Sequence, residues 1–386
     1  MPRKSFGRVR SSLIVVLAVF AAAFAVAAVA TAASSSSTPA WLKPVDAYVQ
    51  QGYKGIDMQV PATGPKAAKH KLVWNIVCSL NIPDCASVNT GVNQAGKALG
   101  WTVNTVDNES DPVTAGTQIM DAVAAKANGI VVTGIDCDAV KSALQAAVNA
   151  GIKTVAAGGQ NCSKPLYDAI SPIGDLPFDT GEEYVFTKGR IDWAMASHKG
   201  NLKFIVLNVT DLAAVYLETD QMERDIKVCP TCKIIDTIDV TAASSFSGLG
   251  QDVAAALTKY PQANALWIFN GSAFDFGVKT DLVNAGRATG KNRMLIVSGT
   301  CSYGEPALIR AGWDIGCDAF SLTWNGWAAM DQLNRLFAGE KPSQIPEVGV
   351  GLQIVDATHN LPKGSAWVPP INYVADYKKL WATGKS

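Results

Sequence analysis

The chain has 386 residues, which is too long for one compact core and suits two or three domains of about 100–200 residues each. Hydrophobic residues make up 48% of the sequence and charged residues 17%, so the chain can bury a core and is not intrinsically disordered. Basic and acidic residues both number 33, and this balance argues against nucleic-acid binding, which usually shows as clustered positive charge.

Residues 1–32 have the pattern of a secretory signal, with an apolar run over 13–33 that contains the small-residue motif Ala30-Thr31-Ala32. We expect cleavage after Ala32, which predicts an exported protein, periplasmic or extracellular. The alternative is an uncleaved membrane anchor, because the run is long enough to span a bilayer. Cleavage takes four of the 33 basic residues and no acid, so the mature chain carries 29 basic and 33 acidic residues. The four are Arg3, Lys4, Arg8 and Arg10.

Residues 33–69 are predicted to form a linker and an N-terminal extension. A Ser/Thr-rich spacer over 34–39 is expected to be flexible. Residues 41–66 have the pattern of a short amphipathic segment that is followed by a Pro/Gly-rich link.

From Lys71 onwards, Val- and Ile-rich runs alternate with helical patterns, which is the signature of βαβ units and a parallel sheet. Gly100, Gly129 and Gly151 each stand between a predicted helix and the next strand, where a helix stop residue belongs. The first half is predicted to contain, in chain order, a strand over 72–78, a helix over 86–99, a strand over 101–107, a helix over 112–127, a strand over 129–133, a helix over 138–149, a strand over 153–157 and a short segment over 168–173.

The alternation then restarts and predicts a second α/β lobe of similar plan. Its elements are, in chain order, a helix over 182–197, a strand over 203–208, a helix over 213–226, a strand over 233–240, a helix over 248–260, a strand over 265–269, a helix over 274–285, strands over 294–298 and 314–320, a helix over 324–337, a strand over 349–356 and a closing helix over 374–383.

Eight cysteines in an exported chain favour disulfides, because that compartment is oxidising. Spacing alone does not fix the pairing. The positions nevertheless cluster, and we propose four local bridges: Cys78 with Cys85, Cys137 with Cys162, Cys229 with Cys232, and Cys301 with Cys317.

The motif Cys229-Pro230-Thr231-Cys232 has a second interpretation, a redox-active CxxC. Such motifs act when the first cysteine lies at a helix N-terminus after a strand, whereas this one follows a helical stretch and precedes the strand over 233–240. A structural clip is therefore favoured over a thiol oxidoreductase. No metal site is predicted, because no histidine has ligand spacing to a cysteine pair; the three are His70, His198 and His359.

In an open α/β sheet, ligands bind in the crevice beyond the carboxyl ends of the strands. Two such lobes make a cleft without any catalytic residue. In this order and spacing, the chain over 70–375 resembles the periplasmic binding proteins of the ribose/galactose type, the substrate-catching subunits of ABC importers. The segments that carry the resemblance are Val73-Trp74-Asn75-Ile76-Val77, Ala98-Leu99-Gly100-Trp101, Ala127-Asn128-Gly129-Ile130-Val131-Val132, Ala150-Gly151-Ile152-Lys153-Thr154-Val155, Ala265-Leu266-Trp267-Ile268-Phe269-Asn270 and Asn284-Ala285-Gly286-Arg287.

The resemblance implies an α/β fold of two doubly wound parallel-sheet lobes joined by a three-crossing hinge, and closure of rigid lobes around a ligand. The crossings are expected near 171–175, 320–323 and 344–350. Lobe 1 is then predicted over 70–173 plus 321–345, lobe 2 over 174–320 plus 346–375, and a C-terminal tail over 376–386.

The resemblance also implies a set of ligand-facing positions. It places polar residues after three strands of the first lobe, the family's frequent arginine near Tyr216, a common polar contact at Asn270, and the frequent aspartate of a later loop at Cys301. The predicted ligand-binding residues are Ser79, Asn81, Asp84, Asp136, Gln160, Tyr216, Asn270, Phe274, Cys301 and Phe320.

The ligand class follows less directly. Tyr216 and Phe320 are aromatic where the family has charged or polar residues, which favours a less polar cyclic or aromatic solute as the ligand. A sugar would need hydrogen-bond partners for each of its buried hydroxyls. Each residue also has a structural alternative: Asp136 as a helix cap, Asn270 as a turn residue, and Tyr216 and Phe320 as core.

The predicted function is ligand capture and delivery to an ABC transporter permease by a monomeric exported protein. The alternative is a ligand sensor whose closed form docks on a membrane receptor. No enzyme activity or cofactor is predicted, because the chain has no G-x-S-x-G motif and no Gly-rich phosphate loop.

Overall fold

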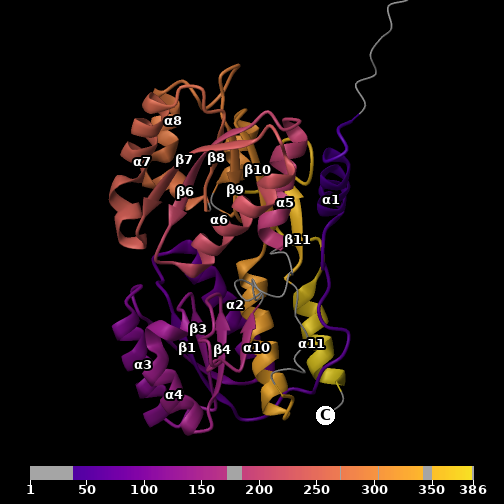
Figure 1. Cartoon of the computed structure of the whole chain (residues 1–386). Coiled ribbons are helices and arrows are strands. Elements are labelled where there is room, and N and C mark those ends of the chain that lie inside the picture. Colours follow the sequence, from indigo (N-terminus) through magenta and orange to yellow (C-terminus); the bar gives the residue numbers. More distant parts are fainter. Residues whose placement is uncertain (1–37, 172–184, 270, 303, 342–349, 385–386) are drawn as a thin grey trace, which may run out of the picture. The chain divides into compact units, whose positions relative to one another are not determined.

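The computed structural model describes residues 38–171, 185–269, 271–302, 304–341 and 350–384, and the chain from Pro39 onwards forms one compact unit. Two separate α/β sheets build this unit (Figure 1). Among the described residues, no helix has both the length and the apolar character that crossing a membrane requires.

The first sheet is entirely parallel, in the order β2-β1-β3-β4-β5. Alternate residues of each strand point to opposite faces. Val131 therefore packs on α10, and its neighbours Ile130 and Val132 pack on the side of α3 and α4. The elements are β1 (Leu72–Val77), α2 (Pro83–Leu99), β2 (Thr102–Asp107), α3 (Pro112–Ala124), β3 (Gly129–Thr133), α4 (Lys141–Asn149), β4 (Lys153–Ala157) and β5 (Ala169–Ser171).

The second sheet has the order β11-β10-β9-β8-β6-β7, and all its strands are parallel except β11, which pairs antiparallel to β10. Its two faces are covered by separate hydrophobic clusters. The elements are α5 (Val185–Ser197), β6 (Lys203–Val209), α6 (Ala213–Asp225), β7 (Lys233–Val240), α7 (Ala242–Lys259), β8 (Ala265–Trp267), α8 (Lys279–Asn284), β9 (Leu295–Ser298), α9 (Glu305–Arg310), β10 (Asp314–Phe320) and β11 (Leu352–Val355).

The predicted fold class, two mainly parallel α/β sheets, is confirmed, and the differences are local. Helix α7 begins at Ala242 rather than 248, because Thr241 and Ser244 form a reciprocal capping box there. The single helix predicted over 274–285 is interrupted, since Gly277 has a φ of 102° inside the π-helical turn Phe274–Val278 that precedes α8. The short helix α9 and the antiparallel direction of β11 were not predicted.

One of the three predicted hinge crossings is described in full. The last strand residue before it, Phe320, leads directly to Ser321, whose side chain accepts a hydrogen bond from Trp324 N and starts α10 (Leu322–Phe337). Helix α10 packs on the first sheet, so the chain changes sheets here. The crossings predicted near 171–175 and 344–350 lie almost wholly outside the described residues.

The C-terminal residues return to the first sheet. Helix α11 (Tyr373–Thr383) packs along α10 (Figure 1), with Trp381 stacked on Trp327 at 5.5 Å between ring centroids. Residues 376–386, predicted as a tail, therefore include most of a helix whose Tyr377, Leu380 and Trp381 are buried.

All eight cysteines are paired, in the four predicted bridges: Cys78–Cys85, Cys137–Cys162, Cys229–Cys232 and Cys301–Cys317. The Cys229–Cys232 bridge follows a short 3₁₀ turn and precedes β7, which is the order expected of a structural clip. The buried Cys229 side chain lies over the carbonyl of Gly200.

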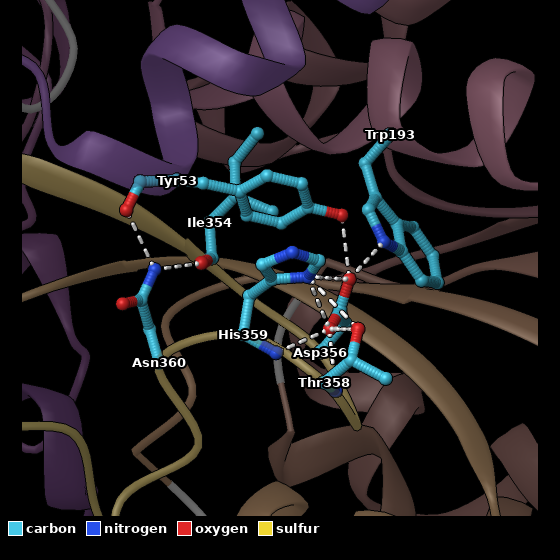
Figure 2. Close-up of polar contacts among 7 residues, drawn as sticks. All are labelled: Tyr53, Trp193, Ile354, Asp356, Thr358, His359 and Asn360. Carbon is cyan, nitrogen blue, oxygen red and sulfur yellow. Dashed lines mark hydrogen bonds and ion pairs between the residues drawn. The ribbon is translucent and has the colours of Figure 1, made fainter.

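Helix α1 (Leu42–Lys54), from the N-terminal extension, belongs to the core of the second sheet. Leu42, Val45 and Val49 are buried in one cluster with α5 and β11. A polar cluster at the end of α1 adds directional contacts (Figure 2). The Tyr53 hydroxyl donates to Asp356 Oδ2 at 2.6 Å, and Trp193 Nε1 of α5 donates to the same oxygen at 3.0 Å.

The Asp356 carboxylate is the centre of this cluster. Burial alone would raise its pKa, but the hydrogen bonds from Tyr53, from Thr358 and from Trp193 hold the pKa below its ordinary value. The other oxygen, Oδ1, accepts from the backbone N–H groups of Thr358 and His359, both at 2.7 Å. The ring of His359 stacks on Tyr53 with centroids 3.6 Å apart.

We expect Asp356→Asn to lower the free energy of unfolding by about 1.5–3 kcal/mol at pH 7, because hydrogen bonds to a charged acceptor contribute that much. A carboxyl whose pKa is depressed by folding stabilises the protein above its unfolded pKa, and this contribution is lost as the pH falls through the folded pKa. Urea unfolding should therefore show the gap between variant and parent shrinking below about pH 4. A gap that stays constant from pH 7 to pH 3 would contradict this role of the charge.

Candidate ligand-binding site

The loops that follow β1, β3 and β4 lie at one edge of the first sheet. These three strands are parallel neighbours, so their carboxyl ends meet there. Four predicted ligand residues are in these loops: Ser79, Asn81, Asp136 and Gln160. The structure therefore brings together the predicted residues of the first lobe.

The loops after β3 and β4 are fastened to each other. Asp136 Oδ1 accepts a hydrogen bond from Gln160 N at 2.8 Å, and Gln160 O accepts one from Cys137 N at 2.8 Å. Glycine is needed at 159, since a Cβ there would lie 2.7 Å from the Ile135 carbonyl oxygen. The Cys137–Cys162 bridge closes the same pair of loops. The half-buried Asp136 carboxylate is thus held in a fixed position.

The loop after β1 is shaped in a similar way. Asp107 Oδ2, at the end of β2, accepts a hydrogen bond from Leu80 N at 2.9 Å, and the buried Ser79 accepts one from Asn81 N at 3.2 Å. Asn81 is exposed, and Asp84 is half-buried in the first turn of α2. Both lie close to the Cys78–Cys85 bridge in sequence.

Tyr216 is the predicted residue of the second lobe that approaches these loops. It lies on α6, directly after β6, and is half-buried. Burial raises the pKa of the Tyr216 hydroxyl, and the negative charges of Asp136 and Asp220 raise it further.

The remaining predicted residues are placed differently. Phe274 is buried edge-on against Trp313 with centroids 5.8 Å apart, and Cys301 is fully buried in its disulfide. Both side chains therefore pack in the hydrophobic core of the second lobe. Phe320 is buried at the described hinge crossing. Asn270 lies outside the described residues.

A buried charged network in the second lobe was missed by sequence reasoning. Arg190 on α5 is 1% exposed, and its guanidinium forms an ion pair with Glu218 of α6. It also donates to the carbonyls of Ile268 and Phe269 at the end of β8, at 3.4 and 3.3 Å. This network fixes α6, and hence Tyr216, relative to the end of β8. The available signal was Arg190 directly before the mostly apolar stretch Ile191–Met195, in which Asp192 is the one charged residue.

Asp318 of β10 is the third charged residue of this network, and burial changes its pKa. Asp318 is buried and accepts a hydrogen bond from Arg190 N at 2.9 Å. Burial raises the pKa of Asp318 well above its ordinary value, although the nearby Arg190 charge opposes this rise. The hydrogen bond from Arg190 N to Asp318 thus joins α5 to β10.

Comparison with known proteins identifies the family. A model described as a periplasmic binding protein domain matches residues 76–341, so the chain belongs to the periplasmic binding protein family. No curated protein sequence matches the chain.

Solved structures share the fold at low sequence identity. A sugar ABC transporter protein from Yersinia enterocolitica is 17% identical over 80% of this chain and 89% of its own, with a TM-score of 0.64. A galactofuranose-binding protein is 14% identical over 74% of this chain and 95% of its own, with a TM-score of 0.61. A periplasmic ribose ABC transporter protein from Conexibacter woesei is 18% identical over 76% and 94%, with a TM-score of 0.60. The resemblance expected from the sequence is confirmed.

Proposed function

We propose that this protein is an exported, monomeric solute-binding protein that captures a sugar or sugar-like molecule between its lobes and delivers it to an ABC transporter permease. The observations that carry the proposal are the family match over residues 76–341 and the fixed loops after β3 and β4, where Asp136 accepts a hydrogen bond from Gln160 N. These loops follow the carboxyl ends of their strands, where open α/β sheets bind their ligands.

The arrangement of side chains favours a carbohydrate over a less polar solute. The first lobe offers a carboxylate at Asp136, an amide at Gln160 and a further amide at the exposed Asn81. Phe274 and Cys301 are buried in the apolar cluster of the second lobe. Tyr216 remains as one aromatic ring, which suits the apolar face of a sugar while the polar groups pair with its hydroxyls.

Export is the second part of the proposal. The basic start, the apolar run over 13–33 and the Ala30-Thr31-Ala32 motif support removal of residues 1–32 as a signal. Four disulfides in one chain fit an oxidising compartment. Free diffusion there would carry ligand to the permease.

A thermal-shift screen of the chain from Ala33 tests the ligand class. The panel contains D-ribose, L-arabinose, D-galactose and allitol, with adenosine and benzoate as less polar competitors. A ligand at about 100 times its Kd stabilises a protein by about 2.7 kcal/mol, so we expect a clear rise in Tm with at least one sugar. A rise only with adenosine or benzoate would overturn the sugar assignment and keep the capture mechanism. If no compound of the panel raises the Tm, the proposal that the protein binds a sugar of this kind is contradicted.

A further inference from the structure

The N-terminal segment over 39–70 contacts both lobes, although it precedes the first strand. Its first part, α1, is anchored on the second lobe by buried apolar residues and by the Tyr53–Asp356 hydrogen bond. Asn360 Nδ2 also donates to the Tyr53 carbonyl at 2.9 Å (Figure 2). This end of the segment is therefore held by side chains and backbone together.

The other end is anchored on the first lobe by α10. Asn334 is fully buried, and both the oxygen and the nitrogen of its side-chain amide form hydrogen bonds with the backbone of the segment. Its Oδ1 accepts from Ala68 N at 2.9 Å, and its Nδ2 donates to Pro65 O at 3.2 Å and Lys66 O at 3.3 Å. Arg335, the next residue of α10, donates to Thr63 O at 2.5 Å.

Two contacts from outside α10 complete this anchor. Trp101 Nε1 donates to Ala68 O at 2.7 Å, and Ala67 N donates to Trp381 O of α11 at 3.0 Å. The residues over 63–68 thus meet three different parts of the first lobe. Such a set of directional bonds holds an extended backbone in one register.

Between the two anchors, the segment runs beside the start of β11. Ile56 and Leu352 exchange two backbone hydrogen bonds, at 2.9 and 3.0 Å. Met58 packs so closely on Gly351 that a Cβ there would lie 2.7 Å from the Met58 sulfur. Residues 350–352 lie at the end of the hinge crossing that the sequence predicts near 344–350. We call residues 55–68 the N-terminal strap.

We propose that the N-terminal strap is an additional connection between the lobes that limits how far they open in the ligand-free protein. The proposal rests on the proposed function, because opening matters only if ligand enters between the lobes. From Ile56 to Thr63 the chain can span roughly 25 Å at full extension. Wider separation of the anchors breaks hydrogen bonds at one of them.

A limited opening also affects affinity. The apparent Kd of a protein rises when the binding-competent state is less populated. A strap that excludes widely open states keeps the competent state populated, so releasing the strap is expected to weaken binding several-fold and to enlarge the ligand-free molecule.

The test is a protease recognition sequence inserted between Pro61 and Ala62, outside both anchors. Cleavage leaves every anchoring contact in place and removes only the covalent link. The matched control carries the same insertion between Gly290 and Lys291, in an exposed loop between α8 and β9 of one lobe. Small-angle X-ray scattering then measures the radius of gyration without ligand for the parent chain, which has no insertion, and for both insertion variants after cleavage.

We expect cleavage at the strap, and not at the control loop, to increase the ligand-free radius of gyration. A second variant inserts roughly ten Gly and Ser residues at the same point and stays uncleaved, so that loss of α1 does not explain the result. Equal radii for strap and control variants would overturn the proposal. This readout needs no ligand, so a failed sugar screen leaves it valid and the two failures are distinguishable.

Discussion

Arg335→Leu is expected to lower the free energy of unfolding by about 3–5 kcal/mol, because it leaves a buried carboxylate without its cation. Asp331 is fully buried, and its Oδ2 accepts from Arg335 Nε at 2.8 Å. Its other oxygen accepts from Trp381 Nε1 at 2.7 Å. Burial raises the pKa of Asp331, and the Arg335 charge opposes this rise. Urea unfolding followed by circular dichroism measures the loss.

The matched control is an exposed ion pair at i,i+3 spacing, against i,i+4 for the buried pair. Lys141 and Asp138 are 3.2 Å apart with side chains 56% and 70% exposed, so Lys141→Leu should cost no more than about 1 kcal/mol. The double variant Asp331→Leu with Arg335→Leu should recover part of the loss, since no charge is then buried alone. If Arg335→Leu lowers the free energy of unfolding no more than Lys141→Leu does, the claim that burial makes the Arg335–Asp331 pair important for stability is wrong.

Asp136→Ala is expected to weaken sugar binding roughly 10- to 150-fold, because a hydrogen bond to a charged group contributes about 1.5–3 kcal/mol. Its control is Asp138→Ala, two residues along, whose exposed carboxylate pairs only with Lys141 among the contacts described. Isothermal titration of both variants with the most stabilising sugar of the thermal screen gives the two Kd values. Equal Kd values for the two variants would contradict the assignment of Asp136 as a ligand-binding residue.

Local patterns in the sequence were sufficient to predict the sheets. Strands such as Ile130–Val132 are continuous apolar runs because both faces of a parallel strand are covered. The glycine at position 100 stops α2 with a φ of 71°, as expected of a helix end. The cysteine pairs were predictable because each bridge closes a short stretch of chain, of which the longest separates its cysteines by 25 residues.

Contacts between distant parts of the chain were not predictable from these patterns. Nothing in the sequence near Tyr53 indicates a partner 303 residues away at Asp356. The same holds for Asn334, which reads as one more polar residue of an amphipathic helix but binds the strap. Cys301 was predicted at the ligand from its position after a strand, and Phe274 was predicted there at the start of a helix, whereas the side chains of both are buried in the core. Their roles depend on tertiary packing, which one sequence does not encode locally.

The central claim is that the two lobes close on a sugar, and the most direct test is small-angle X-ray scattering of the chain from Ala33 with and without the sugar that stabilises it most. Hinge closure moves rigid lobes toward each other. We therefore predict that the radius of gyration falls on saturation with that sugar and is unchanged by a sugar that does not raise the Tm. Saturation with no change in the radius of gyration would contradict capture by closure.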